Sequence, residues 1–270
     1  MKLLKATEKY EEQLKEYFET VETVKIEELT PEVINKKSDV KKHAKSVSEY
    51  DAAYFKIPQK NAIFGRVLLE TIEEMGVQTN YPSTAFFIMA KKNYLYHVLH
   101  QRDIPSPKTA VIADEKAVRN IENHLRGPLI ARKLKNLEEV EKTMIDEVKD
   151  IKKFSEGLEY GENLLIFSEY TKGDKYKCLY AGGDIISLKD TSEDWKFDND
   201  SLKYSSLPSD LQETVKKTCQ QIGTPIAELV IRGDKIVDIK PNPDLEMYTK
   251  LSGKDAFESV TEVLKGEVDQ

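Results

Sequence analysis

The first half of the chain alternates short apolar runs with amphipathic stretches, which is the pattern of strands followed by helices. Apolar residues recur every three or four positions over 61–75, which predicts a helix capped by Asn61 and stopped by Gly76. Apolar runs at 52–57 and 77–80 predict a strand on either side of it. A strand–helix–strand unit is typical of an open parallel sheet. Further predicted elements are a helix over 8–19, a strand over Val21–Leu29, a short helix from Ser83 and a helix over 91–102.

Residues 34–49 are rich in lysine and serine. A solvated helix or loop is favoured there over a binding patch.

The pattern changes after the two prolines at 105 and 107. Alternating strands and helices over about sixty residues predict a small α+β unit, followed by a unit dominated by antiparallel strands. The first has predicted strands over 108–113, 128–134 and 164–170, a helix beginning at Asp114 and a long amphipathic helix over 137–154. The second has predicted strands over 176–181, 184–188, 226–232 and 235–240, and helices over 208–222 and 254–265. Between them, the polar stretch 189–206, which contains Trp195, is long for a loop and is expected to be functional or disordered.

The composition of the chain argues against membrane-spanning, nucleic-acid-binding and disulfide-rich proteins. At 270 residues, with 39% hydrophobic and 33% charged residues, the chain is expected to be a soluble protein of two domains, or of one domain with a lid. No apolar run approaches the roughly 20 residues of a membrane span. A net charge of −7 argues against a nucleic-acid-binding protein. Cys178 and Cys219 are too few for a disulfide framework and lack metal-ligand spacing, so we expect a cytoplasmic location.

The segment Ile226–Leu245 carries candidate chemistry. It predicts a hairpin with Glu228 on its first strand and Asp238 near the end of its second. Residues on one face of adjacent strands lie within about 5 Å of each other, and two carboxylates so placed suit a magnesium ion. Taken alone, the segment is better explained by an ordinary hairpin with solvated charges.

Several motifs in their order along the chain change that balance. Residues 51–111 and the segments GPLIARKL, LLIFSEYTKGD and the carboxylate hairpin resemble the ATP-grasp superfamily, in its RimK-like branch of ribosomal-protein glutamate ligases. The resemblance covers about three quarters of the chain and hardly touches the first fifty residues. Its motif residues are Gly76–Val77, Asn80 with Pro82, Lys92, Leu99 and the run Ile104–Pro105–Ser106–Pro107–Lys108–Thr109.

The resemblance implies a fold and a function. The expected fold is α/β and α+β: an N-terminal parallel-sheet domain (1–90), a linking helix with an ATP-grasp lid (91–168) and a C-terminal antiparallel-sheet lobe (169–270). The expected function is an ATP-dependent carboxylate–amine ligase that uses ATP and Mg²⁺ and forms an acyl-phosphate. Its partners would be a small-molecule or peptide carboxylate and an amine, with no membrane and no nucleic acid, and a homo-oligomer is compatible with this expectation.

The resemblance also implies roles for single residues. Lys92 and Arg132 would hold phosphates, with Lys133 as the alternative to Arg132 on the opposite face of its strand. Ser168, Glu169 and Tyr170 would form the segment that reads the adenine. Lys177, with Lys175 in reserve, would be the catalytic cation near the reacting carboxylate or γ-phosphate. Glu228 and Asp238 would be magnesium ligands, and Lys240 would be a cation beside the phosphates.

Two departures from the family pattern leave the function open. The segment KLKNLEEVEK contains no glycine where the family has a glycine-rich loop, and Lys240 stands at the asparagine of the motif Glu-x-Asn-x-x-Pro. An active ligase, which the sequence favours, therefore competes with a degenerate binding module of the same fold, and more distantly with a small-molecule kinase. A direct contact between Lys240 and either carboxylate would favour the module, and a gap wide enough for a hydrated ion would favour the enzyme.

Overall fold

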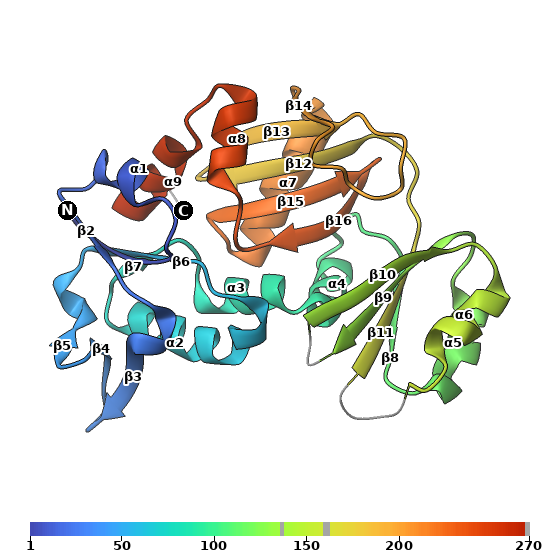
Figure 1. Ribbon diagram of the computed structural model, residues 1–270, viewed down its shortest axis with the longest axis horizontal. Helices are drawn as coiled ribbons and strands as arrows, with labels where there is room; N and C mark the ends of the chain where they lie inside the picture. The colour runs from blue at the N-terminus through green and yellow to red at the C-terminus, as the bar shows by residue number, and fades with distance from the viewer. Residues whose placement is uncertain (136–137, 159–162, 268–270) are drawn as a thin grey trace.

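The computed structural model describes residues 1–135, 138–158 and 163–267 (Figure 1). The described strands form four sheets: a parallel one at the N-terminal end, a small antiparallel one beside it, and two larger sheets with antiparallel pairing. The predicted combination of α/β and α+β architecture is confirmed. None of the helices in the described part of the chain is long and apolar enough to cross a membrane.

The N-terminal parallel sheet has the strand order β2–β1–β6–β7. Its strands carry the side chains of Leu3, Leu4 and Phe55 into the interior, where all three are almost fully buried. The bounds are β1 (Lys2–Ala6), β2 (Thr20–Thr23), β6 (Ala52–Phe55), β7 (Gln78–Thr79), with α1 (Glu11–Lys15), α2 (Ala62–Glu74), α3 (Ser83–Ala90) and α4 (Lys92–Gln101). The helix expected over 8–19 is therefore only the five residues of α1.

The prediction for residues 34–49 is wrong. This region belongs to a three-stranded antiparallel sheet of β3 (Leu29–Ile34), β4 (Lys37–Lys42) and β5 (Lys45–Ser46), and the strand expected over Val21–Leu29 is divided between β2 and β3. The lysines obscured the pattern, because β4 buries one residue, Val40, beside α2 and leaves its other side chains at least partly exposed.

Helices α2 and α3 approach closely at Gly65, which is buried in the first turn of α2. A methyl group built there would lie 2.8 Å from Cγ2 of Ile57 and 2.9 Å from Cε1 of Phe86, closer than carbon atoms pack. Gly65→Ala is therefore expected to lower the free energy of unfolding by about 1–3 kcal/mol, despite the better helix propensity of alanine. Denaturant unfolding measures this, with Ile63→Ala on the exposed face of the same helix as the control. Equal stability of both variants would contradict the close approach.

Strands β10, β9, β11 and β8, in that order, form an antiparallel sheet with two helices on one face, and this unit is called the lid below (Figure 1). The amphipathic helix predicted over 137–154 is wrong, since the described part of that segment is a strand followed by a shorter helix. Strand β10 is an edge strand whose first five side chains are exposed, so it shows no apolar alternation. The bounds are β8 (Thr109–Ile112), α5 (Val118–His124), β9 (Leu129–Lys135), β10 (Glu138–Ile145), α6 (Val148–Ser155) and β11 (Asn163–Glu169).

The C-terminal lobe is an antiparallel sheet of order β14–β13–β12–β15–β16. The predicted hairpin is present as β15 (Ile226–Arg232) and β16 (Lys235–Lys240), while helix α8, at 245–252, was not anticipated. The hairpin turn packs tightly on the chain that leaves the lid: Gly233, at φ 57°, has no room for a side chain against the carbonyl oxygen of Lys172. The other bounds are β12 (Lys175–Ala181), β13 (Asp184–Asp190), β14 (Leu202–Tyr204), α7 (Ser209–Ile222), α8 (Leu245–Ser252) and α9 (Ala256–Lys265).

Candidate functional site

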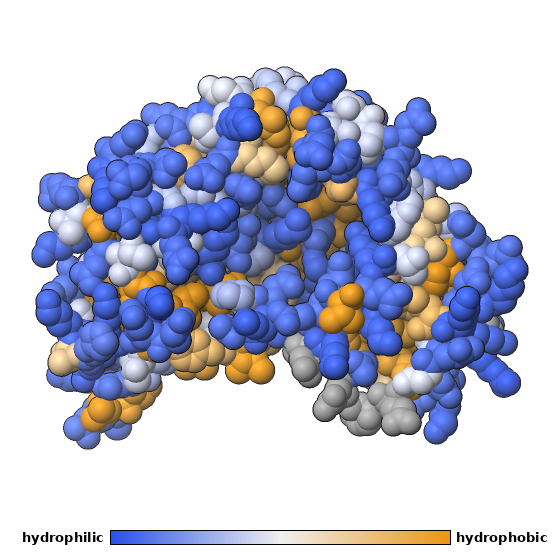
Figure 2. All heavy atoms as spheres, viewed as in Figure 1, coloured by the Kyte–Doolittle hydropathy of each residue, from blue (hydrophilic) through white to orange (hydrophobic). Residues whose placement is uncertain are grey.

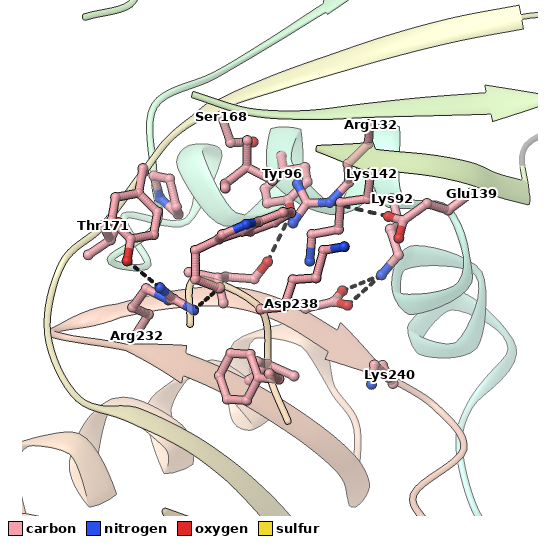
Figure 3. A pocket seen from close by; sticks show the side chains of 18 of the residues that line it. Lys92, Tyr96, Arg132, Glu139, Lys142, Ser168, Thr171, Arg232, Asp238 and Lys240 are labelled. Carbon is pink, nitrogen blue, oxygen red and sulfur yellow. Dashed lines mark hydrogen bonds and ion pairs between the residues drawn. The ribbon is translucent and has the colours of Figure 1, made fainter. Parts of the chain in front are cut away.

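A cleft of about 600 Å³ lies between the lid and the C-terminal sheet (Figure 3). It is bordered by β9 and β10 of the lid, by Lys92 and Tyr96 of α4, by the chain at 168–171, and by strands β12, β15 and β16. Although the chain carries a net charge of −7, its described lining has seven cationic side chains against three anionic ones. The cations are Lys92, Arg132, Lys142, Lys177, Lys196, Arg232 and Lys240. Such a cleft suits a strongly anionic ligand.

The carboxylate hairpin presents one face to this cleft. Glu228 pairs directly with Lys240, and Val230 pairs with Asp238, so both carboxylates are on the same face of the sheet. The residue opposite Glu228 is thus a lysine, and Asp238 lies two positions along β16. Glu228 is buried below the cleft lining, where Tyr248 donates its hydroxyl to the Oε2 atom at 3.3 Å.

Each of these carboxylates already has a lysine partner. The Nζ atom of Lys240 lies 2.8 Å from Oε1 of Glu228, and the Nζ atom of Lys92 lies 2.6 and 2.5 Å from the two oxygens of Asp238. Burial works to raise the pKa of Asp238, but the charges of Lys92 and Lys240 outweigh it and lower that pKa. Burial likewise works to lower the pKa of Lys240, and the carboxylates of Glu228 and Asp238 outweigh it and raise the pKa. Asp238 and Lys240 are therefore both charged at neutral pH.

Arg132 is buried in the wall of the cleft with one unused donor. Its Nε atom lies 3.2 Å from Oε2 of Glu139, and its guanidinium lies 5.5 Å from the ring centre of Tyr96. Its Nη1 atom is buried and has no hydrogen-bond partner among the described residues. Buried donors are seldom left unsatisfied in folded proteins, so this donor is available to an acceptor that enters the cleft. Lys133, the alternative from the sequence, does not line the cleft.

The segment Ser168–Tyr170 lines the cleft, but much of its hydrogen bonding is directed into the lid. The N–H groups of Glu169 and Tyr170 donate to the carbonyl oxygens of Lys108 and Pro128. These amides are not free for a ligand. The next residue, Thr171, lines the cleft with a buried hydroxyl that has no partner in the described part of the chain.

The structure distinguishes the two candidate catalytic lysines. Lys177 lines the cleft, and its Nζ atom donates to Oδ1 of Asn199 at 2.5 Å. Burial lowers the pKa of Lys177, while the nearby Glu228 works in the opposite direction. Lys175 does not line the cleft and is bound to the loop that follows β13. Its position favours Lys177 for the predicted role.

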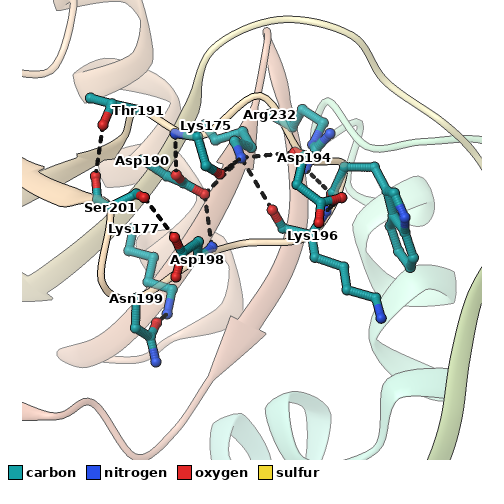
Figure 4. Close-up of polar contacts among 12 residues, drawn as sticks. Lys175, Lys177, Asp190, Thr191, Asp194, Lys196, Asp198, Asn199, Ser201 and Arg232 are labelled. Carbon is teal, nitrogen blue, oxygen red and sulfur yellow. Dashed lines mark hydrogen bonds and ion pairs between the residues drawn. The ribbon is translucent and has the colours of Figure 1, made fainter.

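That loop, residues 190–201, forms an ordered strap beside the cleft (Figure 4). The ammonium of Lys175 donates to Ser192 Oγ at 2.7 Å, to the carbonyl oxygens of residues 194 and 196, and lies 2.7 Å from Asp190 Oδ2. Asp190 in turn accepts from the backbone N–H groups of residues 192 and 198. The strap residues that line the cleft are Trp195, Lys196, Phe197 and Asn199.

The structure adds cleft residues that the sequence analysis did not single out. Lys142 lies opposite Arg132 in the β9–β10 pairing, and its ammonium is 5.8 Å from the ring centre of Trp195 on the strap. Arg232 donates to the hydroxyl of Tyr170 at 2.6 Å and to the carbonyl oxygen of Trp195. The alternation of β10 would have placed Lys142 on the face of Arg132, had that segment been recognised as a strand. The glycine-poor turn between β9 and β10 includes residues 136–137, which lie outside the described residues.

Comparison with known proteins agrees with this architecture over nearly the whole chain. The ATP-grasp ligase PsnB, solved with a minimal precursor, superposes with a TM-score of 0.70 at 13% identity and 98% coverage of both chains. A RiPP-associated ATP-grasp ligase from Chryseobacterium gregarium, in complex with ADP and a leader and core peptide, also gives 0.70, at 13% identity, over 100% of this chain and 98% of that one. The chain has the ATP-grasp fold.

The RimK-like resemblance is also found among these comparisons. A RimK-domain ATP-grasp protein from Sphaerobacter thermophilus gives a TM-score of 0.68 at 15% identity, over 98% of this chain and 99% of that one. A protein of Trichodesmium erythraeum described as a "Probable alpha-L-glutamate ligase" is 22% identical over 247 residues, which are 86% of this chain and 83% of that protein. No family model matches the chain.

The donor set of this ATP-grasp cleft does not suit a divalent metal ion in the arrangement described. Magnesium requires several oxygen ligands in octahedral geometry. Glu228, Asp238 and Glu139 are each paired with a lysine or arginine, and no group of three metal-ligating side chains occurs among the described residues. Glu228 and Asp238 could therefore act as the predicted metal ligands only if their ion pairs with Lys240 and Lys92 were broken.

Proposed function

We propose that this protein is an ATP-dependent carboxylate–amine ligase whose cleft holds the nucleotide between lid and C-terminal lobe. The observation that carries the proposal is the buried, unpartnered Nη1 atom of Arg132 in a cleft lined by seven cations. A nucleotide polyphosphate would supply the missing acceptor and the negative charge together. The ATP-grasp fold supports the same assignment.

The cleft residues have distinct roles in this proposal. Lys92, Arg132 and Lys240 bind phosphate oxygens, and Ser168–Tyr170 with the free hydroxyl of Thr171 borders the base. Lys177 stabilises the transferred phosphoryl group or the reacting carboxylate. Positioning and charge stabilisation of this kind supply most of the catalysis in phosphoryl transfer.

The reaction has two steps. A carboxylate oxygen of the substrate attacks the γ-phosphorus of ATP, the bond from that phosphorus to the β–γ bridging oxygen breaks, and ADP leaves. The amine nitrogen then attacks the acyl carbon of the acyl-phosphate, inorganic phosphate leaves with the electrons of the C–O bond, and the nitrogen loses a proton. The carboxylate belongs to a small molecule or a peptide. Peptide complexes of two structurally similar proteins support the inclusion of peptides: an ATP-grasp ligase with a leader and core peptide, and the macrocyclase MdnC with its precursor peptide MdnA.

A competing form of the proposal keeps Glu228 and Asp238 as Mg²⁺ ligands. It requires Lys240 and Lys92 to leave these carboxylates when the nucleotide enters.

Turnover tests the ligase directly. The protein is incubated with ATP and a panel of amino acids and acidic peptides, with hydroxylamine as a general amine acceptor, and ADP release and hydroxamate formation are measured. We expect ADP release that depends on one class of carboxylate, with an equal amount of hydroxamate. ADP formation without hydroxamate would instead identify a kinase.

A degenerate binding module is the second candidate, and the direct contact between Lys240 and Glu228 favours it. It predicts nucleotide binding with no carboxylate-dependent turnover. The same assay distinguishes the two candidates.

The pH dependence of nucleotide binding is expected to depend on Lys142. Although Lys142 is an exposed residue of β10, desolvation by the surrounding protein and the charge of Arg132 lower its pKa to about 8. A bound polyphosphate favours the charged ammonium and raises this pKa, so binding at pH 8 should take up about half a proton and weaken as pH rises from 7 to 9. Calorimetry in two buffers of different ionisation enthalpy measures the uptake. Lys142→Arg should retain the affinity and lose the uptake, and an unchanged uptake would contradict the assignment.

A further inference from the structure

Three carboxylates in or just below the cleft are each paired with a cation. Asp238 is held by Lys92, Glu228 by Lys240 and Glu139 by Arg132, at distances of 2.5 to 3.2 Å. The three pairs come from α4, the lid and the C-terminal hairpin. Figure 3 shows the Arg132–Glu139 pair on the lid side of the cleft and the Lys92–Asp238 pair on the opposite side.

The Lys240 ammonium lies 2.8 Å from Oε1 of Glu228, the first of the two carboxylates that a metal ion would need. It lies directly across the strand pair from Glu228 and also lowers the pKa of Asp238, so its charge acts on both carboxylates. The Glu228 side chain is only 5% exposed, whereas that of Lys240 is 39% exposed. Lys240 therefore covers the carboxylate of Glu228 and lines the cleft itself.

An ammonium has three N–H donors, and Glu228 accepts only one of those of Lys240 in the described contacts. Donors therefore remain for phosphate oxygens. The pairing with a buried carboxylate fixes the direction of the ammonium before a ligand arrives, which reduces the ordering cost of binding.

We propose that the cleft binds nucleoside di- and triphosphates without a divalent metal ion, with Lys240 and Lys92 as fixed cations in its place. This inference rests on the nucleotide site of the proposed function and specifies the ionic form of the ligand. The uncomplexed nucleotide carries more negative charge than its magnesium complex. The excess of four cations over anions in the described lining matches that form.

Calorimetric titration with ADP, in EDTA and then in excess Mg²⁺, tests the inference. We expect binding in EDTA that is at least as tight as in Mg²⁺, and that weakens as NaCl is raised because direct ion pairs are screened. Binding that requires Mg²⁺ by tenfold or more would overturn the inference and leave the proposed function standing. No binding under either condition would contradict the proposed function as well.

A charge reversal at Lys240 sharpens the test. Lys240→Glu places a second carboxylate opposite Glu228, so affinity for ADP in EDTA should fall by about a hundredfold and Mg²⁺ should restore part of it. Lys240→Arg keeps the charge and should bind within about threefold of the wild type in EDTA, which also shows that the position tolerates substitution. Lys217→Glu, on the exposed face of α7, makes the same change in net charge and should bind like the wild type. Wild-type affinity of Lys240→Glu in EDTA would overturn the inference.

Discussion

Lys177→Met is expected to lower the turnover number of the ligation reaction by about 10²- to 10³-fold, while ADP affinity changes by only about threefold. Lys177 is the cleft lysine held by Asn199 of the strap, and it has no carboxylate partner in the described ion pairs. Its charge is therefore available to the group that becomes more negative during transfer. An interaction made mainly in the transition state affects turnover more than ground-state binding.

Steady-state ADP release and calorimetric ADP binding, measured on the same preparation, test this prediction. Lys203→Met is the matched control, because Lys203 is an exposed lysine on β14 outside the cleft. Equal losses of turnover in both variants would remove the catalytic assignment. A loss of ADP affinity as large as the loss of turnover would instead make Lys177 a nucleotide-binding residue.

Lys175→Met is expected to lower the free energy of unfolding by about 3–5 kcal/mol, because it leaves the buried carboxylate of Asp190 without its cation. The Asp190 side chain is fully buried and that of Lys175 is 6% exposed. Lys175 also holds the strap through Ser192 and two backbone carbonyl oxygens. Loss of the strap contacts should therefore accompany the loss of stability.

Denaturant unfolding measures the effect, and Lys189→Met on the neighbouring strand is the control. Lys189 pairs with Asp174 at 2.8 Å, but the Asp174 side chain is 60% exposed, and exposed ion pairs contribute at most about 1 kcal/mol. A similar small loss in both variants would show that the Lys175–Asp190 pair is not the anchor of the strap.

The elements predicted most accurately are those whose pattern of apolar and polar residues matches their burial in the fold. Strands β15 and β16 have the predicted bounds, because a Gly233 turn separates two apolar runs. Strand β10 was mistaken for a helix because its exposed edge position removes the alternation that identifies strands. Strand β4 was missed for a related reason, since Val40 is its one buried residue.

The sequence identified most residues of the candidate site, but not the contacts between them. Lys92, Arg132, Lys177, Asp238 and Lys240 all line one cleft, as their positions in the family motifs implied. The ion pair between Lys92 and Asp238 joins residues that are 146 positions apart in the chain. It forms through tertiary packing, so no local sequence pattern predicts it. The conformation of the strap could not be predicted for the same reason, because the side chains that hold it belong to β12 and β15.

The central claim, that this cleft is a nucleotide site, can be tested with the intrinsic fluorescence of Trp195. It is the single tryptophan of the chain, and it lines the cleft together with Arg132 and Lys92. Titration with ADP is predicted to change its emission saturably in the wild type, and the double variant Lys92→Gln/Arg132→Gln is predicted to shift the midpoint by about a hundredfold or more. An emission that ADP does not change, together with no heat of binding, would contradict the account, as would a midpoint unaffected by the double variant.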